Sequence, residues 1–182
     1  MASTDPRKKR TALFIDRDGT LIIDKGYLSD PAQVELLPGA KSALVDFVSA
    51  GYLLFLFTNQ SGVGRGLYAF DDVIACNRRM LDLLELPAPG FAEICIAPEG
   101  PDDPIVYRKP SPRFIHEMIA RHDLDSAQSW MAGDKLSDVQ TALNAGIRPV
   151  LLNSTAPVDL PAGVTRCADL KEFATRLFQG QL

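Results

Sequence analysis

The stretch TALFIDRDGT, residues 11–20, decides the fold of this chain. It begins with a short apolar run that predicts a buried strand and ends in charged residues. Side chains two apart on an extended segment point the same way, so Asp16 and Asp18 can face one site while Arg17 faces elsewhere. Gly19 permits a sharp turn directly afterwards. The stretch alone also fits a capped turn, whereas a calcium loop fits less well because no Glu follows at loop spacing.

Short apolar runs alternate with helical patterns along the rest of the chain. Further buried strands are predicted at residues 52–57, 91–97, 130–133 and 149–152. Helices are predicted between Pro38 and Gly51 and at residues 70–86, 113–121, 137–145 and 169–178. Strands that alternate with helices form βα units, which build a parallel sheet. We therefore expect an α/β fold, a Rossmann-like parallel sheet with helices on both faces.

Length and composition are those of a single globular domain: 182 residues, 46% of them hydrophobic and 23% charged. We expect residues 1–10 to be a flexible tail, because their basic run is not followed by the apolar segment of a secretory signal, and residues 11–182 to be one domain. The net charge of −4 argues against a nucleic-acid partner. No apolar stretch approaches the roughly 20 residues of a membrane span. Three widely spaced cysteines indicate a reducing compartment, and we expect a cytoplasmic protein.

Polar clusters follow three of the predicted strands, at residues 16–20, 58–61 and 134–138. Ligands of open parallel sheets bind beyond the carboxyl ends of the strands. Each cluster alone also has an ordinary interpretation, as a polar turn or as the N-cap of the next helix. Their shared position at strand ends is the main argument for an active site.

Three aspartates in these clusters suggest metal and proton chemistry. Asp16 and Asp18 repel each other if held close, so one can serve as an ionised nucleophile and the other as a proton donor. Asp134 would add a third carboxylate, and Mg²⁺ prefers a few carboxylates together with water and phosphate oxygens. Asp138, four residues further on, could orient Lys135.

Two other segments offer groups that suit a phosphate. Thr58 places a hydroxyl at a strand-to-loop turn, where backbone N–H groups also suit phosphate oxygens. Arg108 and Lys109 lie in an extended, proline-flanked segment just before a predicted helix. Lysine provides a compact charge and arginine a bidentate clamp, although a solvated charge pair is an equally ordinary interpretation.

These motifs together resemble the haloacid dehalogenase (HAD) phosphatase superfamily. The resemblance spans about residues 11–152 and rests on four motifs in order: FIDRDGTL, FTN, RKP and GDKLSD. More narrowly, the chain resembles the D-glycero-D-manno-heptose 1,7-bisphosphate phosphatases, through DRDGTLIIDKGYLSDP, LLPGA, FTNQSGVGRGLY, RKPSP and MAGDKLSD. The histidinol-phosphate phosphatases are close relatives of that family. Family members of this length lack a large cap domain.

The resemblance implies a Mg²⁺-dependent phosphatase that forms an aspartyl-phosphate on Asp16. Asp18 would protonate the leaving oxygen and then activate water, while Thr58 and Lys109 would hold the transferring phosphoryl group. The implied metal ligands are Asp16, Asp134 and, through its backbone carbonyl, Asp18. The implied substrate-binding residues are Asp24, Lys25, Gly26, Tyr27, Asn59, Gln60, Ser61, Arg108 and Lys135.

The chain departs from the family in one loop. Many relatives carry a zinc loop of the form C-x-H…C-x-C before the RKP motif, but the corresponding residues here are Ala97, Glu99, Ile105 and Tyr107. A closed zinc site needs four nitrogen or sulfur ligands, so we predict no zinc. We expect the loop at residues 98–104 to be held by its prolines and by packing instead.

The leading hypothesis is a monomeric phosphatase that acts on heptose bisphosphate, a small phosphorylated sugar. Histidinol phosphate is an alternative substrate, and a non-catalytic phosphosugar-binding protein is an alternative of another class. A nucleic-acid 3′-phosphatase shares the first motif, but the acidic balance of the chain weighs against it.

Overall fold

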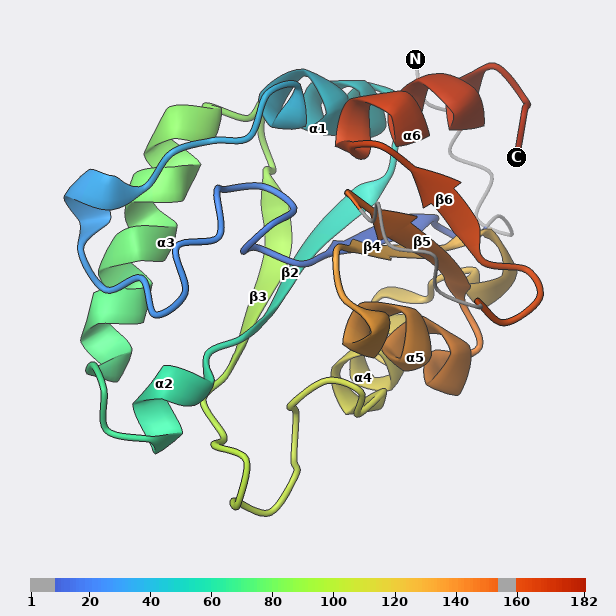
Figure 1. Cartoon of the computed structure of the whole chain (residues 1–182). Helices are drawn as coiled ribbons and strands as arrows, with labels where there is room; N and C mark the ends of the chain where they lie inside the picture. The colour runs from blue at the N-terminus through green and yellow to red at the C-terminus, as the bar shows by residue number, and fades with distance from the viewer. Residues whose placement is uncertain (1–8, 154–159) are drawn as a thin grey trace.

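A six-stranded, fully parallel sheet forms the centre of the molecule, which is a computed structural model describing residues 9–153 and 160–182 (Figure 1). The strands lie in the order β3-β2-β1-β4-β5-β6. Their bounds are Ala12–Ile15 (β1), Leu53–Asn59 (β2), Phe91–Ala97 (β3), Trp130–Gly133 (β4), Arg148–Leu152 (β5) and Thr165–Cys167 (β6). This is the strand order of doubly wound nucleotide-binding folds, and it confirms the predicted Rossmann-like sheet.

Helices cover both faces of the sheet. Helices α1 (Ala40–Ser49), α3 (Phe70–Leu84) and α6 (Leu170–Phe178) pack on one face, and α4 (Arg113–His122) and α5 (Leu136–Ala145) pack on the other. The shorter elements are α2 (Ser61–Gly64) and the 3-10 helices η1 (Pro31–Gln33) and η2 (Ser126–Gln128). The two-sided packing explains why the strands read as continuous apolar runs.

The core therefore has two layers, one on each side of the sheet. All four residues of β1 are fully buried, with Leu13 and Ile15 facing one layer and Phe14 the other. The Phe14 ring stacks on Phe55 at 4.8 Å between centroids and meets the edge of Phe114 from α4 at 6.0 Å. Because β1 lies between β2 and β4, this packing fixes the centre of the sheet, on which the residues after β1 depend.

Some boundaries and elements differ from the sequence-based expectation. The helix predicted at residues 70–86 ends two residues early, at Leu84, because Glu85 adopts a left-handed conformation with φ of 45°. Helix α2 and strand β6 were not predicted, since neither carries an apolar run. Of the predicted tail, residues 1–8 lie outside the described residues, and Arg10 donates a hydrogen bond of 2.8 Å to the carbonyl of His122.

The described chain forms this one layered unit without a large cap domain, as expected. The two long connections at the carboxyl edge of the sheet are residues 16–39, after β1, and residues 98–112, after β3. Within the described residues neither contains a helix longer than three residues. In the described ranges no helix is both long and apolar enough to cross a membrane.

Candidate active site

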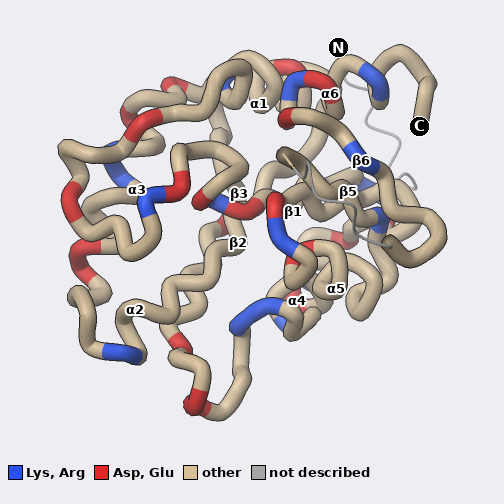
Figure 2. Tube along the Cα trace, viewed as in Figure 1, with Lys and Arg blue, Asp and Glu red and all other residues tan. Residues whose placement is uncertain are grey.

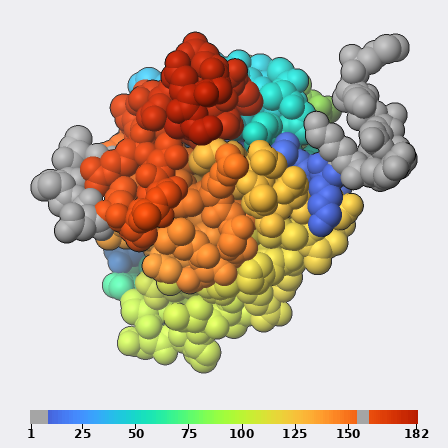
Figure 3. Space-filling view, turned by 90° about the vertical axis from the view of Figure 1, so that its right-hand side faces the viewer, coloured from blue at the N-terminus to red at the C-terminus, as the bar shows by residue number. Residues whose placement is uncertain are grey.

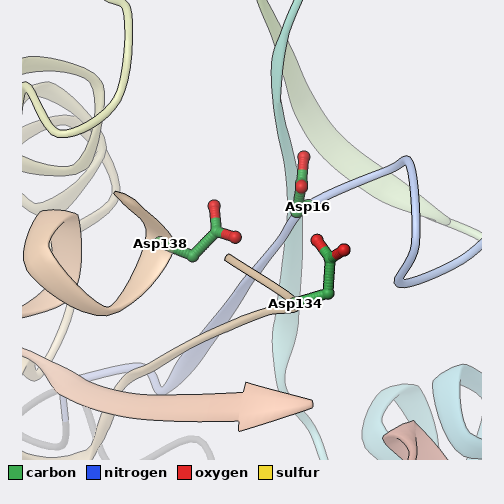
Figure 4. Close-up of side chains that lie close together, drawn as sticks. All are labelled: Asp16, Asp134 and Asp138. Carbon is green, nitrogen blue, oxygen red and sulfur yellow. The ribbon is translucent and has the colours of Figure 1, made fainter. Parts of the chain in front are cut away.

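The strand order reverses between β1 and β4, and a crevice at the carboxyl ends of such strands is the usual ligand site of this architecture. Asp16 directly follows β1, and Asp134 directly follows β4. Asp138 joins them from the first turn of α5, and carboxylate oxygens of the three residues lie within 4.8 Å of one another. Figure 4 shows the three side chains reaching one shared space from these separate elements. The sheet topology thus brings together residues that are far apart in the sequence.

Lys109 supplies the positive charge in this cluster. Its ammonium nitrogen lies 2.8 Å from Oδ1 of Asp16 and 2.5 Å from Oδ1 of Asp138, and all three side chains are almost completely buried. Burial alone disfavours the ammonium ion, but the carboxylates of Asp138 and Asp16 raise the pKa of Lys109 above its usual range. Lys109 is therefore a fixed cation beside Asp16, the predicted nucleophile. Elsewhere along the chain, basic and acidic residues are interspersed (Figure 2).

Asp138 contacts Lys135, as expected, but through the Lys135 backbone and not through its ammonium group. Its carboxylate does not orient the side chain of Lys135, because Oδ1 accepts from Lys109 and Oδ2 accepts the backbone N–H of Lys135 at 3.0 Å. The Lys135 ammonium instead lies 3.1 Å from Asp24. Asp138 therefore caps α5 and holds Lys109 in place. Its approach requires Gly133, because a Cβ there would overlap the Asp138 carboxyl group.

Asp134 has the environment of a cation ligand. Its Oδ1 is buried and has no hydrogen-bond partner in the described structure. Burial, opposed by Lys135 and reinforced by the charge of Asp16, raises the pKa of Asp134 to about 6. An unpartnered carboxylate oxygen beside a second carboxylate fits a hard divalent cation, which prefers oxygen ligands. Asp138 is a poorer ligand candidate, because both of its oxygens already accept hydrogen bonds.

Arg17 contacts Asp18, contrary to the expectation that it faces elsewhere. Its Nε and Nη2 donate to the two oxygens of Asp18 at 3.0 and 3.1 Å, and its Nη1 donates to Asn77 at 2.8 Å. Strand β1 ends at Ile15 and a turn follows, so strand alternation does not extend to these residues. Arg17 is 1% exposed. Its position inside the first motif was the only indication in the sequence of its contact with Asp18.

Thr58 and Gln60 also contact Asp18. Gln60 donates through Nε2 to Asp18 Oδ2 at 2.9 Å and to the Thr58 hydroxyl at 2.8 Å, while its Oε1 accepts from the Tyr68 hydroxyl at 2.9 Å. Both residues are buried. Gln60, expected to bind substrate, is here hydrogen bonded to the two catalytic candidates.

The RKP segment is fixed by Asn59, a second residue expected to bind substrate. The Asn59 amide donates to the carbonyl of Lys109 at 3.2 Å and accepts its N–H at 2.9 Å. The neighbouring Arg108 is partly buried, and no hydrogen bond or ion pair of its guanidinium occurs within the described residues. The Arg108 guanidinium is thus available for an external anion, whereas both the backbone and the ammonium group of Lys109 already have partners.

The remaining predicted substrate residues lie nearer the surface. Asp24 accepts from the N–H of Gly26 at 2.8 Å, and Lys25 pairs with Glu35 at 2.5 Å. The Tyr27 ring is half exposed, and its contacts are the Tyr68 ring at 6.3 Å and the guanidinium of Arg65 at 6.0 Å. Ser61 is the first residue of α2. Their roles in substrate binding stay predictions.

The loop without zinc ligands has contacts that were not expected. Two carboxylates organise it by accepting backbone N–H groups, and the expected role of its prolines and of packing stays a prediction. Asp103 accepts from Gly100 at 2.7 Å, and Glu99 accepts from residues that precede the RKP motif. The absence of zinc itself stays a prediction.

Gly19 provides a sharp test of the site's close packing. Its φ is +79°, and a Cβ there would overlap the Asp134 carboxyl group, so Gly19→Ala should displace Asp134. We expect phosphatase activity to fall at least about tenfold, with a loss of about 1–2 kcal/mol in stability from the left-handed conformation. Gly51→Ala is the matched control, because φ is +86° there but no atom lies within 4 Å. Equal activity in the two variants, measured as phosphate release, would contradict the packing argument.

Comparison with known proteins agrees with this geometry. The HAD-hydrolase-like family model matches residues 106–175. The D-glycero-beta-D-manno-heptose-1,7-bisphosphate 7-phosphatase of Helicobacter pylori (strain ATCC 700392 / 26695) is 37% identical over 164 residues, which cover 89% of this chain and 94% of that protein. The Rhodopseudomonas palustris protein of the same name is 36% identical over 81% of this chain and 84% of its own length.

Solved structures give the same result. The crystal structure of D,D-heptose 1,7-bisphosphate phosphatase from Bordetella bronchiseptica, complexed with magnesium and phosphate, superposes with a TM-score of 0.86 at 32% identity, over 93% of this chain and 99% of that one. A HAD-like phosphatase from Mesorhizobium loti gives a TM-score of 0.79 at 34% identity, over 95% of this chain and 87% of that one.

The fold and the site thus define a HAD-type hydrolase. Within that class, the chain belongs to the family of the heptose-1,7-bisphosphate 7-phosphatases. The resemblance expected from the four motifs is confirmed.

Proposed function

We propose that this protein removes the 7-phosphate of D-glycero-D-manno-heptose 1,7-bisphosphate in a Mg²⁺-dependent reaction. The observation that carries the proposal is the position of Asp16 at the switch point of the sheet, between the unpartnered Asp134 oxygen and the buried Lys109 ammonium. A carboxylate nucleophile can attack a phosphate anion only if nearby cations offset their mutual repulsion.

Asp16 is the proposed nucleophile. One of its oxygens accepts from Lys109 at 2.8 Å, and the carboxylate attacks phosphorus while the bond to the sugar oxygen breaks. This step forms an aspartyl-phosphate, and the leaving oxygen takes a proton from Asp18. Asp18 then accepts a proton from water, whose oxygen attacks phosphorus, releasing inorganic phosphate and restoring the Asp16 carboxylate.

Asp18 must change partners to perform this role. Both oxygens of Asp18 accept hydrogen bonds from Arg17 or Gln60, so neither is free to face the leaving oxygen. We infer that Asp18 gives up part of this pairing when it is protonated and turned toward the leaving oxygen. Thr58, which lies 3.5 Å from Asp18, and Lys109 would hold the transferring phosphoryl group meanwhile.

The proposed metal is Mg²⁺, held by the carboxylates of Asp16 and Asp134 and by the backbone carbonyl of Asp18. When bound, it would offset negative charge on the phosphoryl group and on the nucleophile. The buried, unpartnered Asp134 oxygen supports this assignment. We propose no zinc, since the positions that hold ligands in zinc-containing relatives are Ala97, Glu99, Ile105 and Tyr107 here and carry no cysteine or histidine.

The remaining proposals concern context. We propose a monomeric, cytoplasmic enzyme made of one domain over residues 11–182, with no nucleic-acid or membrane partner. Three buried free cysteines support a reducing compartment. The heptose assignment is supported by relatives that carry that substrate in their names.

A substrate panel tests the assignment. Phosphate release with Mg²⁺ should be measured for both anomers of heptose 1,7-bisphosphate, for histidinol phosphate and for other sugar bisphosphates. We expect kcat/KM for heptose bisphosphate to exceed that for histidinol phosphate at least about 100-fold. A preference for histidinol phosphate would overturn the substrate but keep the reaction class, and no turnover of any ester would overturn both.

A further inference from the structure

The loop between β3 and α4, residues 98–112, leads from the edge of the sheet to the RKP motif. It extends beyond the helices in Figure 1, and its yellow-green residues form the lower edge of the molecule in Figure 3. The loop doubles back, because Glu99 near its start contacts residues 106–108 near its end. The loop carries Arg108 and also Lys109, whose ammonium contacts Asp16, so the internal order of the loop bears on the site.

Glu99 joins the two arms of this loop. Its Oε1 accepts three successive backbone N–H groups, from Val106 at 3.1 Å, Tyr107 at 2.6 Å and Arg108 at 3.3 Å. Successive N–H groups that converge on one oxygen form an anion-binding nest. Burial disfavours the charged carboxylate, but these N–H groups outweigh it and lower the pKa of Glu99 below its usual range. The arm that ends in Arg108 is therefore tied to an ionised carboxylate.

The arm that carries Glu99 is itself anchored. The N–H of Gly64 in α2 donates to the carbonyl of Pro98 at 2.9 Å, and Asp103 accepts from the N–H of Gly100 at 2.7 Å. The contact is close enough that a Cβ on Gly64 would overlap the backbone nitrogen of Gly100. The backbone next to Glu99 is thus held in place by α2, the short helix that follows β2.

Lys109 is fixed by other contacts, although it directly follows Arg108. The Asn59 amide holds its backbone at 2.9 and 3.2 Å, and Asp16 and Asp138 hold its ammonium. Glu99 makes none of these contacts. Loss of the Glu99 carboxylate should therefore release Arg108 while leaving Lys109 in place.

We propose that Glu99 is a positioning residue that aims Arg108 at the part of the substrate outside the transferring phosphoryl group. The Arg108 guanidinium, which has no hydrogen bond or ion pair in the described part of the chain, is the group that would meet an oxyanion there. The inference rests on the proposed function, since a second anionic group is a property of a sugar bisphosphate. The carboxylate acts through the backbone of residues 106–108, not by touching the substrate.

The kinetic test compares two substrates. Glu99→Ala, and Glu99→Leu in case the first variant folds poorly, should raise KM for heptose bisphosphate at least about tenfold with kcat changed less than about twofold, because neither side chain can accept the three N–H groups. Turnover of p-nitrophenyl phosphate, which has no second anionic group, should change less than about twofold. Asp102→Asn, which removes a charge from an exposed position of the same loop, is the matched control.

A double variant and hydrogen exchange complete the test. Glu99→Ala combined with Arg108→Ala should bind heptose bisphosphate no worse than Arg108→Ala alone, because both remove the same contact. The backbone amides of residues 106–108 should exchange at least about tenfold faster in Glu99→Ala than in the parent protein.

Three outcomes would overturn the inference: equal losses on both substrates, additive losses in the double variant, or unchanged exchange. If the parent protein does not hydrolyse heptose bisphosphate, the proposed function fails by itself. Hydrogen exchange needs no substrate, so it still decides whether Glu99 orders residues 106–108. A normal parent enzyme with an unaffected Glu99→Ala variant would reject only the positioning role.

Discussion

Asp16→Asn is expected to lower kcat for any phosphate ester by at least about 10³-fold, because an amide cannot replace the attacking carboxylate. The substitution keeps the size of the side chain and its place at the end of β1, where it is 4% exposed, so the sheet should still form. The Lys109 ammonium would lose one of its two carboxylate partners but keep Asp138. The loss should therefore appear in turnover rather than in folding.

The measurement combines single-turnover kinetics with binding. Mass spectrometry of the quenched parent enzyme should detect an aspartyl-phosphate that Asp16→Asn lacks, and the variant should still bind the substrate in the presence of Mg²⁺. Asp82→Asn, on the exposed side of α3, is a control for the lost charge. Unchanged turnover in Asp16→Asn would refute the proposed mechanism.

Lys109→Met should reduce both stability and activity. Methionine fills a similar volume but leaves Asp16 and Asp138 buried, close together and without their shared cation. Removing one partner of a buried ion pair costs about 3–5 kcal/mol, which urea unfolding at pH 7 would measure. The deficit should shrink as the pH falls, because protonation of one carboxylate relieves the repulsion in the variant. Phosphatase activity should fall below detection at every pH.

A second substitution separates the two effects. Asp138→Asn in the Lys109→Met background removes one unpaired charge, and asparagine can still accept the N–H of Lys135 that caps α5. We expect it to recover at least about half of the lost stability without recovering activity. If stability stays as low as in the single variant, the buried ion cluster is not its cause.

The parts of the fold that could be predicted are those in which burial leaves a sequence pattern. Strands β1, β2, β4 and β5 are apolar runs, because a parallel sheet covered on both faces buries both sides of these strands, and the edge strand β3 is mainly apolar although only Cys95 and Ala97 are buried. Strand β6 has three residues, TRC, at the edge of the sheet, and only Cys167 is buried. Strand β6 forms by pairing with β5, and this pairing produces no apolar pattern in the sequence of β6 itself.

Some features of the candidate site could likewise be predicted from the sequence, and others could not. Asp16, Thr58 and Asp134 could be predicted because Asp16 and Asp134 directly follow apolar strands and Thr58 lies in the last two residues of one, and the ends of parallel strands meet at one edge. The partners of Asp138 and Arg17 could not. The Lys109–Asp138 pair joins residues 29 positions apart, and the Arg17–Asp18 pair forms where the strand has already ended. Such pairings follow from three-dimensional packing and not from local spacing.

The hydrogen bonds within the loop at residues 98–108 bear on how this enzyme could be engineered. Glu99 ties its two arms together, the Asp103–Gly100 bond orders its first arm, and α2 contacts it through Gly64. The residues at the strand ends contact this part of the chain mainly through Lys109, which follows the loop and pairs with Asp16 and Asp138. We therefore expect that this segment can be transferred from this chain into a relative as a unit, provided that Glu99, Asp103 and Gly64 are transferred with it. Substrate preference in such chimeras should follow the donor of the loop, while the catalytic rate should follow the recipient sheet.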